Sequence, residues 1–179
     1  MKYIIPILLL ISIDFRAVAT KKNRQPSTVN RQPFMVNGQR STDINRSAFY
    51  NAMEENNKKM VNAQLDELKS APAELKPAFM GAMLMKRASF IGSAVSRLHY
   101  FREGHKMLES AIKQDPDNVE FRFLRLMVQE HAPGTLGYKE DIEKDSEYIR
   151  KHYKSLPEEV QHTIEDYSKK SKLLKLDVS

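Results

Sequence analysis

The sequence contains no cysteine and no tryptophan, and only 6 of its 179 residues are glycine. The absence of cysteine excludes a disulfide scaffold, a thiol enzyme, a cysteine-ligated zinc or iron–sulfur site, and a lipid anchor on an N-terminal cysteine. Apolar residues make up 41% of the chain and charged residues 29%, so the chain is neither disordered throughout nor a membrane protein with several spans. The length favours a single domain.

The first nineteen residues have the three-part layout of a secretory signal peptide. A positively charged start precedes an apolar run from residue 3 to 13, and the tripeptide 17–19 (Ala-Val-Ala) offers the small residues that a signal peptidase accepts. Asp14 and Arg16 end the run well short of the roughly 20 apolar residues that cross a bilayer, so a transmembrane anchor is the less favoured alternative. We predict cleavage after Ala19 and a periplasmic or secreted location, which argues against a nucleic-acid partner.

The net charge of +6 is spread unevenly along the chain. Residues 1–19 carry two basic residues and one acid, residues 20–42 carry five basic residues and no acid, and residues 43–179 carry the remaining 22 of each sign. Residues 20–42 have no hydrophobic period and are rich in Asn, Gln, Ser and Thr, which predicts a disordered basic linker before a neutral domain. We interpret the linker as a solvated spacer; the alternative is weak contact with an anionic envelope surface.

From residue 43 onward, apolar residues recur at steps of three and four, the period of helices that bury one face. Asp43 is the expected N-cap of the first helix, and Asp117 and Asn118 are two candidate N-caps for the fifth. The fifth helix is apolar on most sides and is therefore expected at the centre of the fold. The pattern predicts an all-α bundle or array of about seven helices in antiparallel hairpins, the later ones over residues 57–68, 75–90, 95–113 (or 98–113), 119–131, 139–153 and from 157 onward.

A helical repeat is a further prediction of the spacing. Gly92, Gly104, Ala111 and Pro116 are separated by 12, 7 and 5 residues, which is the spacing of the small positions and closing proline in a tetratricopeptide repeat. The departure from that pattern is Ala88, where a large aromatic residue is usual. Shifting the frame by one repeat length in either direction loses the small residues, so the sequence favours one degenerate tetratricopeptide-like unit and not a solenoid; the alternative is an ordinary helical hairpin.

Four stretches of the chain also resemble a particular family: GAMLMKRASF, YFREGHKMLESAI, PDNVEFRFLRLMVQEHAP and LGYKEDIEKDSEYI. They look like an uncharacterised family of small exported α-helical, tetratricopeptide-like proteins of Bacteroidetes bacteria. The most specific element of the resemblance is the Arg-Phe-Leu-Arg block at 122–125. The resemblance implies a helical fold and an exported location, and it implies no activity.

Two arginines interrupt the most apolar helix. Arg122 and Arg125 lie three positions apart, and Gln129 continues the same face one turn later. A buried guanidinium needs an acceptor, because an unpaired buried charge is strongly destabilising. The favoured interpretation is a structural clamp in which the arginines pair with acids of the sixth helix; the alternative is a two-arginine fork that binds a carboxylate or phosphate. The candidate partners nearby in sequence are Glu120, Tyr138, Asp141 and Asp145.

Catalytic and metal-binding motifs are missing from the sequence. The five histidines have no ligand spacing, and no nucleophile elbow, phosphate-binding glycine loop or calcium loop is present. Met80, Met83 and Met85 offer soft ligands for copper, but their spacing fits a core helix better. We therefore predict no cofactor, no metal and no enzymatic activity.

The function that the sequence favours is protein–protein interaction by a scaffold or adaptor, in which an amphipathic segment of an unknown protein or peptide partner docks on a groove or helix face. This expectation rests on an analogy between folds. The alternative is a small-ligand or envelope-associated binding protein that uses Arg122 and Arg125 as an anion fork.

Overall fold

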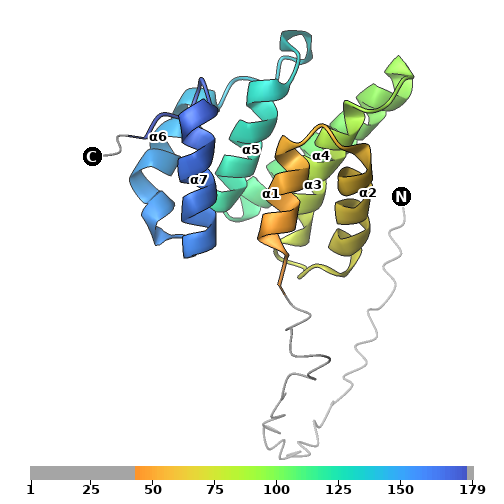
Figure 1. The fold of residues 1–179 in the computed structure, drawn as a ribbon. Coiled ribbons are helices and arrows are strands. Elements are labelled where there is room, and N and C mark those ends of the chain that lie inside the picture. The colour runs from red at the N-terminus through yellow and green to blue at the C-terminus, as the bar shows by residue number, and fades with distance from the viewer. Residues whose placement is uncertain (1–42, 177–179) are drawn as a thin grey trace, which may run out of the picture. The chain divides into compact units, whose positions relative to one another are not determined.

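Seven α-helices follow one another in the computed structural model, which describes residues 43–176 (Figure 1). No strand occurs in this part of the chain, so the predicted all-α class is confirmed. The predicted signal peptide (1–19) and basic linker (20–42) lie outside the described residues, and no helix within 43–176 is long and apolar enough to cross a membrane. The helices are α1 Arg46–Glu54, α2 Lys58–Glu67, α3 Lys76–Ala88, α4 Ala94–Gln114, α5 Val119–His131, α6 Ile142–His152 and α7 Glu158–Lys170, and the 3-10 turns are η1 Leu68–Ser70, η2 Gly134–Leu136 and η3 Tyr153–Ser155.

Short polar side chains set where several helices begin. The side-chain oxygen of Asn57 accepts the first free backbone N–H groups of α2, and that of Asn118 accepts the Phe121 N–H of α5 at 3.0 Å. Asn118, rather than Asp117, is therefore the N-cap of α5. The expected cap of the first helix is corrected: Asn45 caps α1, whereas the Asp43 carboxylate accepts the N–H of Ile44 and an arginine N–H instead.

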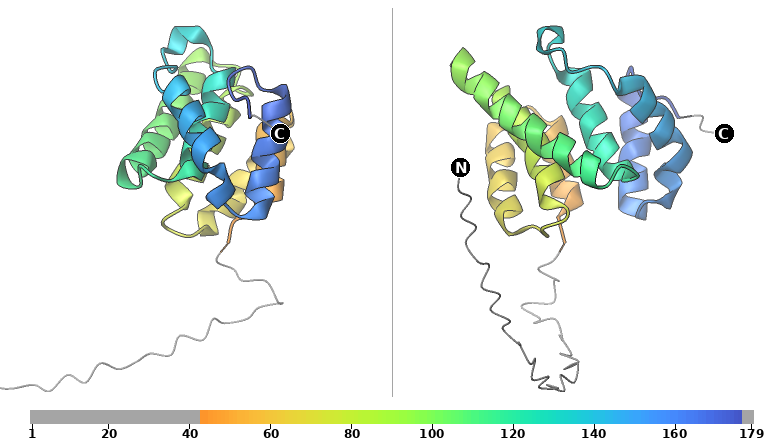
Figure 2. Two further views of the ribbon diagram at one scale, coloured as in Figure 1. Left: turned by 90° about the vertical axis from the view of Figure 1, so that its left-hand side faces the viewer. Right: turned by 180° about the vertical axis from the view of Figure 1, so that it is seen from behind.

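Helix α5 lies between the α3–α4 pair on one side and the α6–α7 pair on the other (Figures 1 and 2). Its residues from Val119 to Gln129 are all buried, which agrees with the predicted central position. The ring of Phe123 lies 5.7 Å from that of Tyr50 on α1 and 5.4 Å from that of Tyr167 on α7. The Phe123 side chain of α5 therefore packs against both α1 and α7 in the core.

The closest helix contact is between α3 and α4, and two glycines permit it. A Cβ added to Gly81 would lie 2.6 Å from the Gly104 carbonyl oxygen and 2.8 Å from the Leu108 amide nitrogen, so the two backbones touch where no side chain fits. Gly92, the first small position of the tetratricopeptide spacing, takes no part in this contact. Gly92 lies in the loop before α4, where an added Cβ would meet nothing within 4 Å. The tetratricopeptide-like unit is not confirmed.

The first half of α4 extends beyond its neighbours (Figures 1 and 2). Val95 is 82% exposed, while Leu98 and Phe101 are partly buried. Only from Gly104 onward does α4 contribute fully buried residues, among them Leu108 and Ala111. The projecting half therefore leaves concave surface beside α5 and η2, and both cavities described below are found there.

Candidate functional site

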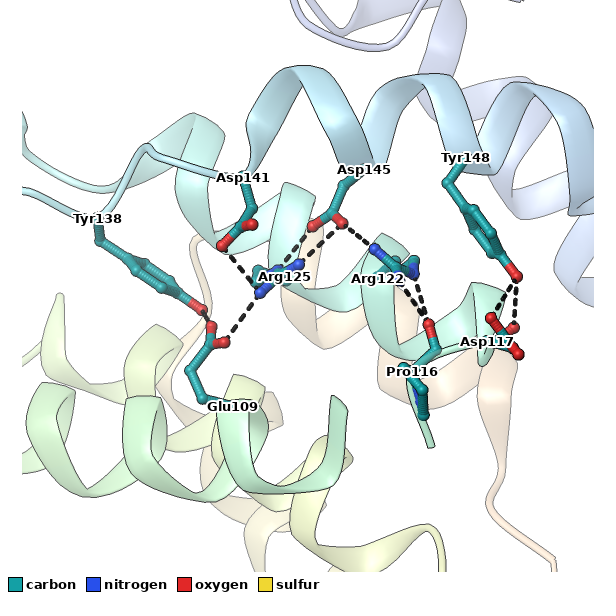
Figure 3. A network of polar contacts seen from close by, with 9 residues as sticks. All are labelled: Glu109, Pro116, Asp117, Arg122, Arg125, Tyr138, Asp141, Asp145 and Tyr148. Atoms are coloured by element: carbon teal, nitrogen blue, oxygen red, sulfur yellow. Dashed lines mark hydrogen bonds and ion pairs between the residues drawn. The ribbon is translucent and has the colours of Figure 1, made fainter. Parts of the chain in front are cut away.

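Arg125 of α5 and Asp145 of α6 form a bidentate ion pair in the interior (Figure 3). Arg125 Nε donates to Asp145 Oδ2 at 2.6 Å, and Arg125 Nη2 donates to Asp145 Oδ1 at 2.9 Å. Burial alone would lower the pKa of Arg125, but the hydrogen bonds and charge of Asp145 and the charges of Glu109 and Asp141 raise it above its usual range. The guanidinium is therefore permanently charged.

Arg122 binds the same carboxylate from the previous turn of α5. Its Nη1 donates to Asp145 Oδ1 at 2.9 Å, while Nε and Nη2 donate to the Pro116 carbonyl oxygen (Figure 3). The guanidinium also lies over the ring of Tyr148, 4.4 Å from its centroid, and the Tyr148 hydroxyl in turn donates to Asp117. The Asp145 side chain is 0% exposed, so these two arginines replace its solvent entirely.

Two further acids complete the group. Arg125 Nη1 donates to Glu109 Oε2 of α4 at 2.9 Å and lies 3.0 Å from Asp141 Oδ2, and the Tyr138 hydroxyl donates to Glu109 Oε1 at 2.6 Å (Figure 3). Burial, and then the hydrogen bond and charge of Glu109, raise the pKa of Tyr138 well above its usual value, so the phenol stays protonated and remains a donor. We call these six residues the arginine network: Glu109, Arg122, Arg125, Tyr138, Asp141 and Asp145.

The charges of the arginine network determine what it can bind. Two guanidiniums face three carboxylates, so the network has one negative charge in excess. Neither Arg122 nor Arg125 is among the residues that line the two cavities described below. This geometry favours a structural clamp over an anion fork, because every nitrogen of both guanidiniums already contacts a carboxylate or carbonyl oxygen and both side chains are buried.

The structure brings together five of the six residues that the sequence nominated (Arg122, Arg125, Tyr138, Asp141 and Asp145), and it adds Glu109, which sequence reasoning missed. Glu109 lies 16 positions before Arg125 on a different helix, and no helical period relates the two residues. Its only signal in the sequence is an acid on the apolar side of α4, between the buried Leu108 and Ala111.

Glu120, which the sequence nominated as a partner of the arginines, pairs instead with residues of α1. It is buried at the start of α5 and accepts from Arg46 of α1 at 2.8 and 3.0 Å and from the Tyr50 hydroxyl at 2.9 Å. At the other end of α5, Glu130 accepts from the Tyr167 and Ser171 hydroxyls and the Lys172 N–H. Polar groups of α5 therefore connect it to α1, α4, α6 and α7.

A polar cavity of about 780 Å³ adjoins the arginine network. Glu109, Tyr138 and Asp141 of the network line it, together with Gln129. Gln129 is 0% exposed, and neither its Oε1 nor its Nε2 has a hydrogen-bond partner. The sequence placed Gln129 on the arginine face of α5, and the structure shows it to be a buried amide that no other group of the described residues satisfies.

A second, more apolar depression of about 870 Å³ lies beside the projecting half of α4. We call it the apolar groove. Its lining includes Met53, Met85, Met127, Leu98, Phe101 and Leu136. Met85, one of the three methionines considered as copper ligands, is therefore a groove and core residue, and Met83 is fully buried. Within residues 43–176, no three His, Cys, Asp or Glu side chains are grouped so as to hold a metal ion.

No protein-family model, curated protein or solved structure matches the chain. The fold and the side-chain geometry therefore carry the functional argument by themselves. They define an all-α protein whose central helix carries buried, ion-paired arginines and which has a polar cavity and an apolar groove.

Proposed function

We propose that this chain is an exported, non-enzymatic helical domain that mediates protein–protein interaction as a scaffold or adaptor. The apolar groove is the observation that carries the proposal. Three methionines, Met53, Met85 and Met127, line it, and methionine adapts its shape to varied apolar partners. A concave apolar surface between helices is the kind of site that the apolar face of an amphipathic helix occupies.

The charges beside the groove specify the partner further. Lys86 is half-buried at the groove and forms no ion pair within the described residues; burial lowers its pKa, and the charges of Glu55 and Glu54 only partly offset this. Arg97 and Lys170 are the other cations of the lining, and Glu54, Glu55 and Glu130 are its acids, so Lys86 stands out by its burial and not by an excess of positive charge. A carboxylate from the partner would relieve the desolvation of Lys86. We therefore propose an amphipathic partner segment with apolar side chains on one face and an acidic residue beside them.

The exported and tetratricopeptide-like parts of the proposal rest on the sequence. The signal-like residues 1–19 and the cleavage motif before Thr20 support export, and the spacing of small residues supports a kinship with helical repeats. Export is tested by the mass of the protein recovered from the cell envelope or medium. The expected chain begins at Thr20, and a chain that still begins at Met1 would contradict cleavage.

The anion-fork alternative is less well supported. Arg122 and Arg125 already bind Asp145, and displacing that carboxylate would bury its charge unpaired. The absence of a recognisable nucleophile, base and oxyanion motif in the sequence supports a non-enzymatic role.

Site-specific photo-crosslinking in the cell tests the interaction. A photoreactive residue replaces Leu136 in the groove, and the control replaces Lys113, an exposed residue of α4 that lines neither cavity. A discrete adduct is expected only at position 136. The captured segment, made as a peptide, should bind the wild-type protein, bind Leu98→Asp about tenfold or more weakly, and bind Lys113→Gln unchanged. A captured segment without apolar and acidic residues, or binding indifferent to Leu98→Asp, would overturn the proposal.

A further inference from the structure

The polar cavity is lined by three parts of the chain: the middle of α4, the end of α5, and the segment from η2 to the start of α6. It shares Leu98, Phe101, Thr135 and Leu136 with the apolar groove, but its remaining lining is different in character. Polar and charged side chains predominate there, and the cavity is large enough for a small organic group.

Gln129 is the feature of this cavity that packing does not explain. Its amide is fully buried on the most apolar helix, and both its donor and its acceptor lack partners. A buried amide that makes no hydrogen bond destabilises the fold, and an apolar side chain of the same size would avoid that loss. The other buried glutamine of the described residues, Gln64, donates to Glu67 at 2.8 Å. Gln129 therefore has an unused donor and an unused acceptor, and its side chain forms part of the cavity wall.

The walls of the cavity favour a positively charged ligand. The rings of Phe101, His105 and Tyr138 lie together, with centroids 4.5 Å apart for His105 and Tyr138 and 5.8 Å apart for Phe101 and Tyr138. Aromatic rings of this kind attract organic cations.

Carboxylates add to this preference. Glu109, Glu140 and Asp141 line the same cavity, against one arginine, Arg102, which is exposed. Asp141 uses one oxygen for Arg125, and Glu140 forms no ion pair within residues 43–176. The lining can therefore hold an ammonium group beside acids, with the Gln129 amide next to it.

We propose that the polar cavity binds an α-ammonium group together with its neighbouring carbonyl, as found at the free amino terminus of a peptide. The ammonium donates to Gln129 Oε1 and to a carboxylate of the wall, and the first carbonyl oxygen accepts from Gln129 Nε2. A single ligand group thereby supplies the acceptor and the donor that Gln129 lacks. The proposal does not rest on the apolar groove, because Gln129 and the three carboxylates that carry it line the polar cavity alone.

Amide NMR titration of the isotope-labelled protein tests the site with two probes. One is tri-alanine amide, which has a free amino terminus and no carboxylate, and the other is the same peptide acetylated at its amino terminus. Saturable shifts are expected for the first probe at resonances of α4, α5 and η2, with at least tenfold weaker binding of the acetylated probe. Equal binding of both probes, or no saturable shift at these resonances, would overturn the proposal and leave the cavity as a hydrated space.

Two variants separate recognition from folding. Gln129→Met keeps the side-chain length and removes both hydrogen-bonding groups, so it should abolish binding without lowering the melting temperature. The matched control, Gln64→Met, changes a buried glutamine that lines neither cavity and should bind as the wild type does. Glu140→Gln, on the exposed rim, removes one carboxylate without touching the interior and should weaken binding severalfold. Undiminished binding by both Gln129→Met and Glu140→Gln would show that the site is wrong.

Discussion

Arg125 and Asp145 form a buried bidentate ion pair across 20 positions of sequence, with Nε 2.6 Å from Oδ2 and Nη2 2.9 Å from Oδ1. The desolvation free energy of the two charges offsets much of the electrostatic attraction between them, so the intact pair contributes only modestly to the free energy of unfolding. Removing one partner is a different matter, because the other charge then remains buried alone. The pair is consequently more important for holding α6 in register on α5 than for net stability.

The first prediction follows from this asymmetry. Arg125→Ala should lower the free energy of unfolding by about 3–5 kcal/mol, because Asp145 would lose its bidentate partner and Glu109 its cation. Urea denaturation measures the change. The control is Arg102→Ala, an exposed arginine without an ion pair in the described residues, which should stay within about 0.5 kcal/mol of the wild type. Unchanged stability of Arg125→Ala would contradict the structural clamp and favour a role for Arg125 in ligand binding.

The second prediction concerns the glycine contact of α3 and α4. Gly81→Ala should destabilise the protein by about 1–3 kcal/mol, since the new methyl group would collide with backbone atoms of Gly104 and Leu108 that cannot rotate away. Thermal unfolding followed by circular dichroism measures the loss. Gly92→Ala places the same methyl group in open space and should leave the melting temperature unchanged or slightly raised. Equal effects of the two substitutions would contradict the close approach.

The third prediction concerns pH. Burial disfavours the charge of Glu130, but hydrogen bonds from Ser171, Tyr167 and the Lys172 N–H outweigh burial and hold its pKa below the usual value. A depressed carboxylate pKa stabilises the fold above the unfolded-state pKa of roughly 4.3, and that stabilisation is lost as pH falls through the folded-state pKa.

Stability curves of the wild type and of Glu130→Gln from pH 7 to pH 3 check this prediction. The wild type should be the more stable at pH 7, and the gap should narrow below about pH 4.5. Glu103→Gln, on an exposed part of α4, is the control and should parallel the wild type throughout. A difference in stability that stays constant from pH 7 to pH 3 would show that titration of the Glu130 carboxylate does not contribute to the pH dependence of stability.

The fourth prediction concerns the core. Phe123 is fully buried and its ring contacts Tyr50 and Tyr167, so Phe123→Ala should cost about 3–5 kcal/mol. Val95→Ala truncates an exposed side chain on the projecting half of α4 and should cost less than about 0.5 kcal/mol. Chemical denaturation distinguishes the two, and a small loss for Phe123→Ala would contradict its central position.

Local patterns predicted the helices well. The bounds expected for α5, residues 119–131, are those observed, and α2 was expected one residue too long at each end. These elements have an apolar period and a strong capping residue, Asn57 or Asn118, in the same stretch of chain. α6 begins at Ile142, three residues later than expected, because Gly137 adopts a left-handed backbone conformation and the following residues form a turn.

Contacts between helices were predictable only where charge demanded them. Arg122 and Arg125 needed acceptors, and two acids after the intervening loop, Asp141 and Asp145, supplied them. The pairing of Gly104 with Gly81 was missed because a glycine contact has no period and no charge to indicate its partner. The Gln129 amide lacks hydrogen-bond partners because the neighbouring helices place none beside it. The spacing of residues along α5 contains no information about those neighbours.

The polar contacts that α5 makes with α1, α4, α6 and α7 have a consequence for how the protein opens. Detaching any one of these four helices removes at least one hydrogen-bond partner from a charged group of α5, so partial unfolding of a single helix is disfavoured. Backbone amides of α5 should then exchange with deuterium only through global unfolding, whereas amides in the projecting half of α4 should exchange through local fluctuations. The helix richest in buried charge becomes the most slowly exchanging part of the molecule.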